Sequence, residues 1–568
     1  MNLFDFVILF GSLVGIAAYG TWRTHNRRSL TTYLKGDQDL RWTAIGISVM
    51  ATQASAITFI STPGQGFQDG LGFVQKYFGM PLALIIIAAV FLPIYRRLNV
   101  YTAYEYLGRR FDSKTRLLGA ALFLFQRGLN AGITIYAPAI ILSTVLGWRL
   151  DLTILLSGLT VIIYTVAGGS QAVVLTQKYQ FGIILGGMVA AFVILLVKLP
   201  ANFTDALTIA GSFHKMQAVD FSLDIHRRYT FWSGIFGGIF LMLAYFGTDQ
   251  SQVQRYISGS SLRASRLGLM FNAVFKIPMQ FLILLLGVLI FVFYQFEPSP
   301  VFFNEVAWQN QARQGSGKKF HALEQKFATV EMEKVQTIKA WLSARHGGDP
   351  KTEATARARA MGAHERSEAV RSEARAALQA ADPRAKTSDA DYVFITFILH
   401  YLPHGLIGLL IAAFFAAALS SKAAELNALG STTTIDFYQH IVKREATDAH
   451  YVTASKWFTF FWGLVAIAFA LFASMTENLV QAANILGSLF YGVILGLFLV
   501  AFFLRWVGGA AVFWGALAAQ ALVLALHFSH LISYLWYNPI GCVACMIFSI
   551  LLQVFIGPKV EPAEARRA

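Results

Sequence analysis

Cysteine and charge are both scarce in this chain. It has two cysteines in 568 residues, and only 14% of its residues are Asp, Glu, Lys or Arg. Two cysteines exclude a disulfide scaffold, and a soluble chain would carry about 25% charged residues. With 56% hydrophobic residues and a mean hydropathy of +0.54, the chain is too apolar to be disordered or collagen-like.

Signatures of catalysis are missing as well. The sequence has no P-loop, no dinucleotide-binding fingerprint and no pairing of a nucleophile with a general base. Cys542 and Cys545 lie in an apolar run, which favours packing thiols over a metal or redox CxxC site. His400 and His404 flank an apolar stretch and are expected at the interface rather than on a metal. The sequence predicts that the protein is not an enzyme.

The chain is rich in long apolar stretches. A bilayer core requires about 20 apolar residues per helix, and the ten-residue alternation typical of a membrane β-barrel is absent. The sequence therefore predicts an all-α polytopic membrane protein with about 13 transmembrane helices. They are expected near residues 3–21, 43–62, 79–98, 117–146, 150–168, 174–198, 230–250, 264–295, 404–428, 455–474, 478–504, 508–528 and 536–556.

Basic residues fall in alternate loops. No Lys or Arg precedes the first stretch, which also lacks a signal-peptide cleavage pattern. The positive-inside rule places the N-terminus outside and the C-terminus in the cytoplasm. Cytoplasmic positions are then expected for Arg23, Arg27, Arg28, Lys35, Arg96, Arg97, Arg109, Arg110, Lys114, Arg116, Arg255, Arg263, Arg266, Lys443, Arg444, Arg505, Lys559, Arg566 and Arg567. These loops account for the net charge of +15 without a nucleic-acid partner.

One polar segment interrupts the apolar pattern. Residues 297–389 carry 15 Lys and Arg and 12 Asp and Glu, and the charge rule places them outside. Apolar residues recur at helical spacing over 320–342, and an Ala-, Arg- and Glu-rich stretch follows over 352–381. We expect a helical hairpin between transmembrane parts 1–296 and 390–557, with 558–568 as a short cytoplasmic tail. The hairpin is either an inert solvated insertion or a surface for a partner or substrate.

Two spans contain polar residues at their centres. The second span has Thr52, Gln53 and Ser55 and is expected to end at Thr62-Pro63-Gly64, and the seventh reads YFGTDQ over 245–250. Interrupted helices free backbone groups for ions and solutes and are typical of transporter sites. The alternative is tight packing of small residues. The adjacent hydroxyls of Ser420 and Ser421 suit sodium, although such hydroxyls also bond back to their own helix.

Two cations lie deep in spans. Lys276 is about 18 Å into the eighth span at 1.5 Å per residue, and Arg127 is near the middle of the fourth. We expect no acidic residue at similar depth, because Asp249 and Glu425 lie nearer the inner ends of their spans. The charged groups of such cations either extend to the membrane interface or face a water-filled cavity that attracts an anionic or hydroxylated solute.

Three motifs resemble those of the sodium/solute symporter family. They are TVAGGSQAVVLT (165–176), DQSQVQRY (249–256) and AAALSS (416–421). The resemblance covers roughly 1–296 and 390–557. Stretches such as YTAYEY (101–106) look like the branch that carries monocarboxylates, vitamins and iodide.

This resemblance implies a LeuT-type fold, with inverted repeats of five helices in spans 2–6 and 7–11. It implies a sodium site formed by the carbonyls of Ala51, Ala54 and Ala417 and the hydroxyls of Ser420 and Ser421. Tyr245 would close the substrate site from the inside. Lys276 matches a lysine that contacts sugar in the bacterial galactose member, but Gln53 and Thr58 do not reproduce that member's other contacts. The substrate residues implied are Gln53, Thr58, Tyr245, Lys276 and Arg127.

The sequence thus predicts a sodium-coupled symporter of a small organic solute, with a preference for a carboxylate or other anion. A sugar symporter of the same family is the alternative, and a membrane sensor that keeps the fold is the rival from another class. The predicted partners are sodium, which is co-transported, a small-molecule substrate and the bilayer, with no oligomeric state indicated.

Overall fold

The described part of the chain is helical throughout. A computed structural model describes residues 1–12, 41–98, 102–257, 259–313, 317–383, 386–472 and 477–556, apart from the side chains of 167–178 and 257. Arg23, Arg27, Arg28, Lys35 and the predicted tail 558–568 lie outside this range. After a short helix at Leu3–Ser12, the principal helices are α3 (Trp42–Gln53), α4 (Ala56–Asp69), η1 (Gly70–Tyr77), α5 (Met80–Ile86), η2 (Ile87–Phe91), α6 (Leu92–Leu98), α7 (Ala103–Arg110), α8 (Ser113–Leu146), α9 (Leu150–Lys198), α10 (Phe203–Ser212), η3 (Ser233–Gly237), α11 (Gly238–Gly247), α12 (Gln250–Ile257), α13 (Leu262–Phe296), α14 (Glu305–Ala312), α15 (Gly317–His346), α16 (Pro350–Ala381), α17 (Ala390–Tyr401), α18 (Leu406–Thr432), η4 (Thr433–Val442), α19 (Asp448–Phe472), α20 (Leu479–Phe503), α21 (Gly509–Ser529), η5 (Tyr534–Trp536) and α22 (Tyr537–Ile556).

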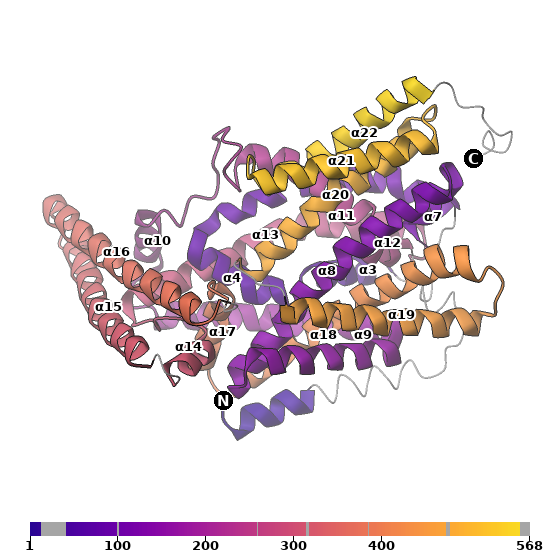
Figure 1. The fold of residues 1–568 in the computed structure, drawn as a ribbon. Helices are drawn as coiled ribbons and strands as arrows, with labels where there is room; N and C mark the ends of the chain where they lie inside the picture. Colours follow the sequence, from indigo (N-terminus) through magenta and orange to yellow (C-terminus); the bar gives the residue numbers. More distant parts are fainter. Residues whose placement is uncertain are drawn as a thin grey trace.

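Many of these helices are suited to a bilayer. Among the described residues, nine are long and apolar enough to cross a membrane, and four shorter apolar helices accompany them. In Figure 1 the long helices form one bundle, with the described N-terminal helix and the C-terminal end of α22 at opposite ends. The shorter helices include Leu3–Ser12, Leu150–Val166 and α17, and both predicted spans 150–168 and 174–198 lie within α9.

Two helices of the bundle are broken near their middle. Helix α3 ends at Gln53, Ser55 is extended, and α4 begins at Ala56. Helix α11 ends at Gly247, and α12 begins three residues later. The predicted interruptions are confirmed at both places. Polar residues at each break explain them, because their side chains compete with the helix for backbone hydrogen bonds.

The predicted end of the second span at Pro63 is wrong. Helix α4 continues through Pro63 to Asp69. A side chain at Gly287 of α13 would meet the Pro63 carbonyl oxygen at 1.9 Å, and one at Gly64 would meet the carbonyl oxygen of Ala390 at the same distance. Glycine at both positions lets α4 approach α13 and α17 closely enough to be held by backbone packing. The chain then continues into η1, whose residues Phe73 and Lys76 are buried.

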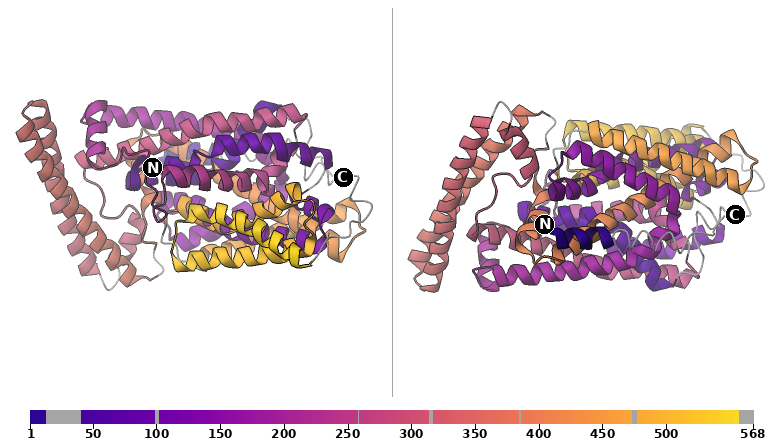
Figure 2. Two further views of the ribbon diagram at one scale, coloured as in Figure 1. Left: turned by 90° about the horizontal axis from the view of Figure 1, so that it is seen from above. Right: turned by 90° about the horizontal axis from the view of Figure 1, so that it is seen from below.

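The polar segment contains two long helices packed against each other. Helices α15 and α16 lie at the end of the bundle that also carries the N-terminal helix, away from the C-terminal end (Figure 2). Near the middle of α15 the Lys334 ammonium donates to Glu331 at 2.6 Å, and Glu331 also accepts from Ser299 and Ser367. The nearby ammonium keeps the pKa of Glu331 below its usual range despite burial.

The far end of α15 is also attached to the rest of the protein. Arg345 and His346 contact the carboxylate of Asp205 in α10 at 3.0 and 2.8 Å. Between the two attachment points, the His364 ring packs against Phe213 and Phe291, with centroids 4.7 and 5.5 Å away. The hairpin is therefore fixed to the membrane bundle at several places along its length.

The two cysteines and His404 have structural surroundings. Cys542 and Cys545 are buried free thiols in α22, which confirms the packing interpretation. His404 contacts the carboxylate of Asp5 at 2.8 Å, and the Gly405 amide donates to the same carboxylate. This contact ties the N-terminal helix to the start of α18. Among the described residues no group of three or more His, Cys, Asp or Glu could hold a metal ion.

Candidate functional site

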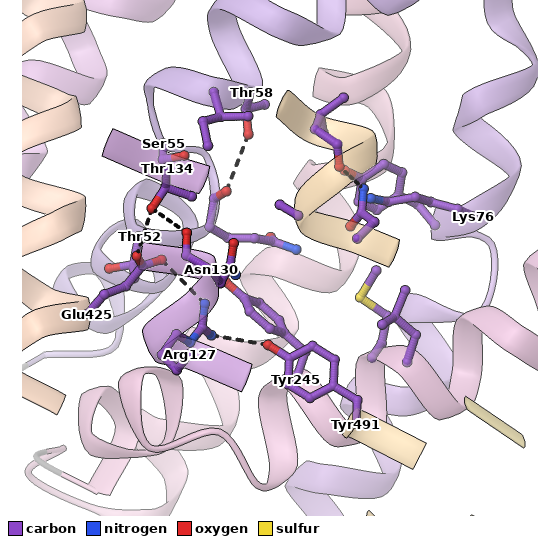
Figure 3. Close-up of a pocket in the computed structure, with 18 residues that line it drawn as sticks. Thr52, Ser55, Thr58, Lys76, Arg127, Asn130, Thr134, Tyr245, Glu425 and Tyr491 are labelled. Atoms are coloured by element: carbon purple, nitrogen blue, oxygen red, sulfur yellow. Dashed lines mark hydrogen bonds and ion pairs between the residues drawn. The ribbon is translucent and has the colours of Figure 1, made fainter. Parts of the chain in front are cut away.

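A cavity of about 120 Å³ lies between the two broken helices. It is smaller than the pockets of about 300–1,000 Å³ that hold drug-sized ligands. Its walls come from the α3–α4 break, η1, α8, α11, α18 and α20, and Figure 3 shows the side chains that face it. The lining residues are Thr52, Gln53, Ser55, Ile57, Thr58, Lys76, Tyr77, Arg127, Asn130, Thr134, Leu241, Met242, Tyr245, Glu425, Val480, Ala483, Asn484 and Tyr491.

Most of the predicted substrate residues are brought together here. Gln53, Thr58, Arg127 and Tyr245 all line the cavity, although they are separated by up to about 190 positions in the chain. Lys276 does not line it. Its ammonium lies 5.8 Å from the ring centroid of Tyr77, so that a lining side chain stands between Lys276 and the cavity.

Arg127 is paired, which corrects the expectation that no acid lies at its depth. Its guanidinium forms an ion pair with Asp249 and contacts Glu425 Oε1 at 3.3 Å. Ser251 and Tyr491 hydroxyl oxygens accept from the same guanidinium at 3.1 and 3.2 Å. Sequence analysis placed Asp249 and Glu425 near the inner ends of their spans because it treated each span as one straight, uninterrupted helix. The α11–α12 break brings Asp249 to the level of Arg127.

A second cation completes this cluster. The Lys422 ammonium donates to Glu425 Oε2 at 2.5 Å, and the Thr134 hydroxyl donates to the same oxygen at 3.2 Å. Asp249 also accepts from the Ser251 amide and from the Tyr491 hydroxyl. Arg127, Lys422, Asp249 and Glu425, here called the paired cluster, carry two charges of each sign. The cluster joins α8, the α11–α12 break and α18, with Tyr491 of α20 in contact with it, and its removal from water is offset by these contacts.

The opposite wall of the cavity has a cation with different surroundings. Lys76, on η1, is 3% exposed. Its ammonium lies 4.6 Å from the ring centroid of Phe73 and 4.8 Å from that of Tyr77. Lys276 is also buried, and its ammonium has no hydrogen-bond partner among the described residues. Aromatic faces attract cations, but less strongly than a carboxylate does.

Backbone carbonyls at the α11–α12 break are satisfied by tyrosines. The Tyr95 hydroxyl donates to the Gly247 carbonyl at 2.6 Å, and the Tyr104 hydroxyl donates to the Thr248 carbonyl at 3.0 Å. At the α3–α4 break the Thr58 hydroxyl donates to the Gln53 carbonyl at 3.3 Å. Away from water every backbone polar group requires such a partner. Protein groups therefore satisfy the backbone carbonyls of the α11–α12 break more completely than those of the α3–α4 break.

The residues predicted to bind sodium lie on two helices that pack against each other. Ala51 and Ala54 are at the end of α3, and Ala417, Ser420 and Ser421 are on α18. The Ser420 hydroxyl donates to the Ala416 carbonyl at 2.7 Å and contacts Gln180 of α9 at 2.8 Å. The Ser421 hydroxyl makes no hydrogen bond with the described residues, although the side chain is 1% exposed. Hydroxyl and carbonyl oxygens are ligands that a hard cation prefers.

Several lining residues were missed by the sequence. Lys76 lies between the second and third predicted spans and was not singled out, but η1 packs inside the bundle against α13. Glu425 and Lys422 were not recognised as a pair, although a three-residue spacing on a helix brings such side chains together. Asn130, Thr134 and Tyr491 have no signal of their own, because only the meeting of α8, α18 and α20 gives them a common cavity.

Comparisons with known proteins agree on one group. A family model described as the Sodium:solute symporter family matches residues 33–312 and 373–519. The Sodium/iodide cotransporter of Homo sapiens is 33% identical over 286 residues, which are 50% of this chain and 43% of that protein. Sodium-coupled monocarboxylate transporter 2 of Mus musculus is 24% identical over 609 residues, which are 98% of this chain and 84% of that protein. The chain spans less than half the length of the first three curated relatives it matches.

A solved structure has a similar fold. It is the substrate-bound, outward-open state of a Na⁺-coupled sialic acid symporter, with a TM-score of 0.74 and 22% sequence identity. The match covers 98% of this chain and 99% of that one. At this level of identity the likeness concerns the arrangement of the helices, and function does not follow from fold alone.

Proposed function

Because the chain belongs to the Sodium:solute symporter family, we propose that it takes up a small organic solute across the cell membrane together with sodium. Members of this family are membrane transporters rather than enzymes. One observation carries the proposal for this chain: a buried polar cavity lies between two helices that are both broken at the level of the cavity. A site at such breaks can be opened to either side by small movements of the helix halves.

The proposed sodium site uses the carbonyls of Ala51, Ala54 and Ala417 and the hydroxyls of Ser420 and Ser421. The packing of α3 against α18 supports it, as does the hydroxyl of Ser421, which has no protein partner in the described structure. Sodium bound there would join α3 to α18 beside the cavity. It would thus favour one conformation of the protein over another, which is what coupling requires.

The sodium gradient is sufficient for uptake without ATP. One sodium ion moving down about 100 mV releases about 2.3 kcal/mol, and a tenfold concentration ratio adds about 1.4 kcal/mol. Together they support accumulation of a neutral solute by several hundred-fold with one sodium ion per solute. Symport of a monovalent anion with one sodium ion moves no net charge, so the concentration ratio alone then supports about tenfold accumulation.

A carboxylate or other anion is the proposed class of solute. Two relatives are transporters of monocarboxylate and of iodide, and the solved neighbour is a symporter of sialic acid. Lys76 brings positive charge to the cavity wall. A neutral sugar is the alternative, supported by the amides of Gln53 and Asn484 in the same wall.

The arrangement in the membrane follows from charge. We propose two inverted repeats of five helices, with the N-terminal helix and the hairpin outside and the C-terminus in the cytoplasm. Figure 1 supports this orientation, since α7 and α12, with Arg109, Arg110 and Arg255, lie toward the end of the bundle opposite the hairpin. The positive-inside rule places such an end in the cytoplasm.

Flux in proteoliposomes tests the function. The full chain is reconstituted, and uptake of radiolabelled propionate, lactate and galactose is measured with an inward sodium gradient or with potassium in its place. We expect accumulation above the equilibrium level with the sodium gradient, and collapse of the accumulation when a sodium ionophore is added. Binding of a solute without any flux would instead identify a sensor, and flux that ignores sodium would contradict the coupling.

A further inference from the structure

The cations at the cavity differ in whether protein charge balances them. The paired cluster contains two cations and two carboxylates, so that Arg127 has no charge left over for a ligand. Lys76 faces the same cavity (Figure 3). It forms no ion pair and no hydrogen bond with the described residues, and its ammonium lies over the rings of Phe73 and Tyr77. This wall therefore carries positive charge that the described part of the protein does not neutralise.

Leaving a buried charge without a partner is expensive. The rings of Phe73 and Tyr77 lower the cost for Lys76. A cation–aromatic contact nevertheless offsets only part of the desolvation of an unpaired ammonium. An anion in the cavity would supply the missing opposite charge at the position where the wall is positive.

Neutral polar groups elsewhere in the cavity favour a carboxylate among anions. The hydroxyl of Thr52 is buried, lines the cavity and has no hydrogen-bond partner in the described structure. Gln53 and Asn484 contribute amides to the cavity lining. A carboxylate has two oxygens, each with two acceptor positions, and so can use an ammonium and a neutral donor together. The volume of about 120 Å³ limits the solute to a small one.

We propose that Lys76 is the group that recognises the solute, and that it does so by pairing with the carboxylate of a small organic acid. This inference rests on the proposed sodium-coupled uptake and names the chemistry of the same cavity. Arg127 in contrast is a positioning residue, which holds the α11–α12 break against α8 and α18 through the paired cluster. Lys276 acts through Tyr77 and does not touch the solute.

The test compares acids with their amides. Melting of the purified full chain is followed by tryptophan fluorescence while acetate, propionate, lactate or pyruvate, each beside its amide, is titrated in sodium and in potassium buffer. Galactose and sodium iodide complete the panel. The variant is Lys76→Gln, and the control is Lys114→Gln, which removes an exposed lysine at the start of α8.

For the wild type we expect a sodium-dependent rise in melting temperature with at least one acid and none with its amide. Lys76→Gln should weaken the apparent affinity for that acid by roughly 10- to 100-fold, the range for a lost charge-assisted hydrogen bond. The response of the variant to sodium alone should remain, and Lys114→Gln should behave as the wild type does.

The outcomes separate this inference from the function beneath it. Undiminished acid affinity in Lys76→Gln overturns the role of Lys76 while leaving sodium coupling intact. A sodium-dependent response to galactose or to iodide alone overturns the carboxylate assignment in the same way. If the melting temperature of the wild type responds to every solute independently of sodium, the result contradicts the proposed function and also this inference, which rests on it.

Discussion

Two sides of one cavity place their positive charge in opposite surroundings. On one side Arg127 and Lys422 are matched by Asp249 and Glu425, and hydroxyls of Thr134, Ser251 and Tyr491 complete the contacts. On the other side Lys76 and Lys276 have aromatic rings as neighbours and no ion pair with the described residues. The first arrangement stabilises the bundle. The second costs stability and is useful only if something from outside the chain completes it.

The largest effect is expected from breaking the paired side. Arg127→Met leaves Asp249 and Glu425 with one cation between them, and an uncompensated buried charge costs about 3–5 kcal/mol. Thermal unfolding of the purified variant should show a clear fall in melting temperature. The double variant Arg127→Met/Asp249→Asn restores charge neutrality, because Lys422 and Glu425 remain as a pair. It should recover much of the lost melting temperature. Equal melting of the single variant and the wild type would show that the cluster is not structural.

The hairpin offers a third environment, in which burial keeps a titratable group neutral. Packing against Phe213 and Phe291 lowers the pKa of His364 from 6.5 to about 4. The folded state thus binds fewer protons than the unfolded one, so this contribution is complete above about pH 6.5 and is lost as the pH falls toward 4. At pH 5 the loss is roughly 2 kcal/mol.

Hydrogen exchange in α15 and α16 measures this effect. Exchange should rise, after correction for the intrinsic rate, between pH 7 and pH 5, because opening of the docked hairpin becomes easier. His364→Phe keeps a ring in place and removes the proton site, so its exchange should not change with pH in that way. The same pH dependence in His364→Phe would assign the effect to other groups.

Sodium binding provides a sharper test on the α18 side of the cavity. Ser421→Ala removes a hydroxyl that has no protein partner in the described structure, so the fold should be unaffected. The sodium concentration needed for half-maximal uptake should rise by roughly tenfold, since a partly dehydrated cation loses one oxygen ligand. The matched control is Ser431→Ala on the same helix, whose hydroxyl donates to the Ala428 carbonyl. Unchanged sodium dependence in Ser421→Ala would refute the assigned site.

The smallest effect is expected at the second lysine of the unpaired side. Lys276→Gln removes a buried charge that the cavity does not contact directly, so melting temperature should stay level or rise slightly. Acid affinity should change by less than about threefold, because the field of the ammonium acts across Tyr77. An affinity loss as large as that of Lys76→Gln would place Lys276 in the binding site itself.

The sequence predicted the class of fold and both helix breaks, because these depend on local features. Twenty apolar residues require a membrane, and polar residues such as Thr52, Gln53 and Ser55 weaken a helix wherever they occur. It also gave Gln53, Thr58, Arg127 and Tyr245 as candidates for one site, and these four share the cavity. The family motifs, rather than periodicity, connected positions so far apart in the chain.

The features that the sequence did not predict depend on tertiary contacts between distant helices. The depth of Asp249 follows from the break before α12 and cannot be read from distance to a span end. Lys76 stood outside every apolar stretch, and only the close passage of α4 along α17 and α13, through Gly64 and Gly287, carries η1 into the interior. Helix α17 was missed because 12 residues are too few to suggest a crossing.

The most direct test of the contrast between the two sides is the melting temperature of Lys76→Met in sodium, with and without the acid that stabilises the wild type. We predict that the variant melts higher than the wild type when no acid is present, because an unpaired buried charge has been replaced by an apolar side chain of similar length. Adding the acid should raise the melting temperature of the wild type and leave that of the variant unchanged. A variant that melts lower than the wild type without acid, or that still gains from the acid, would contradict the account.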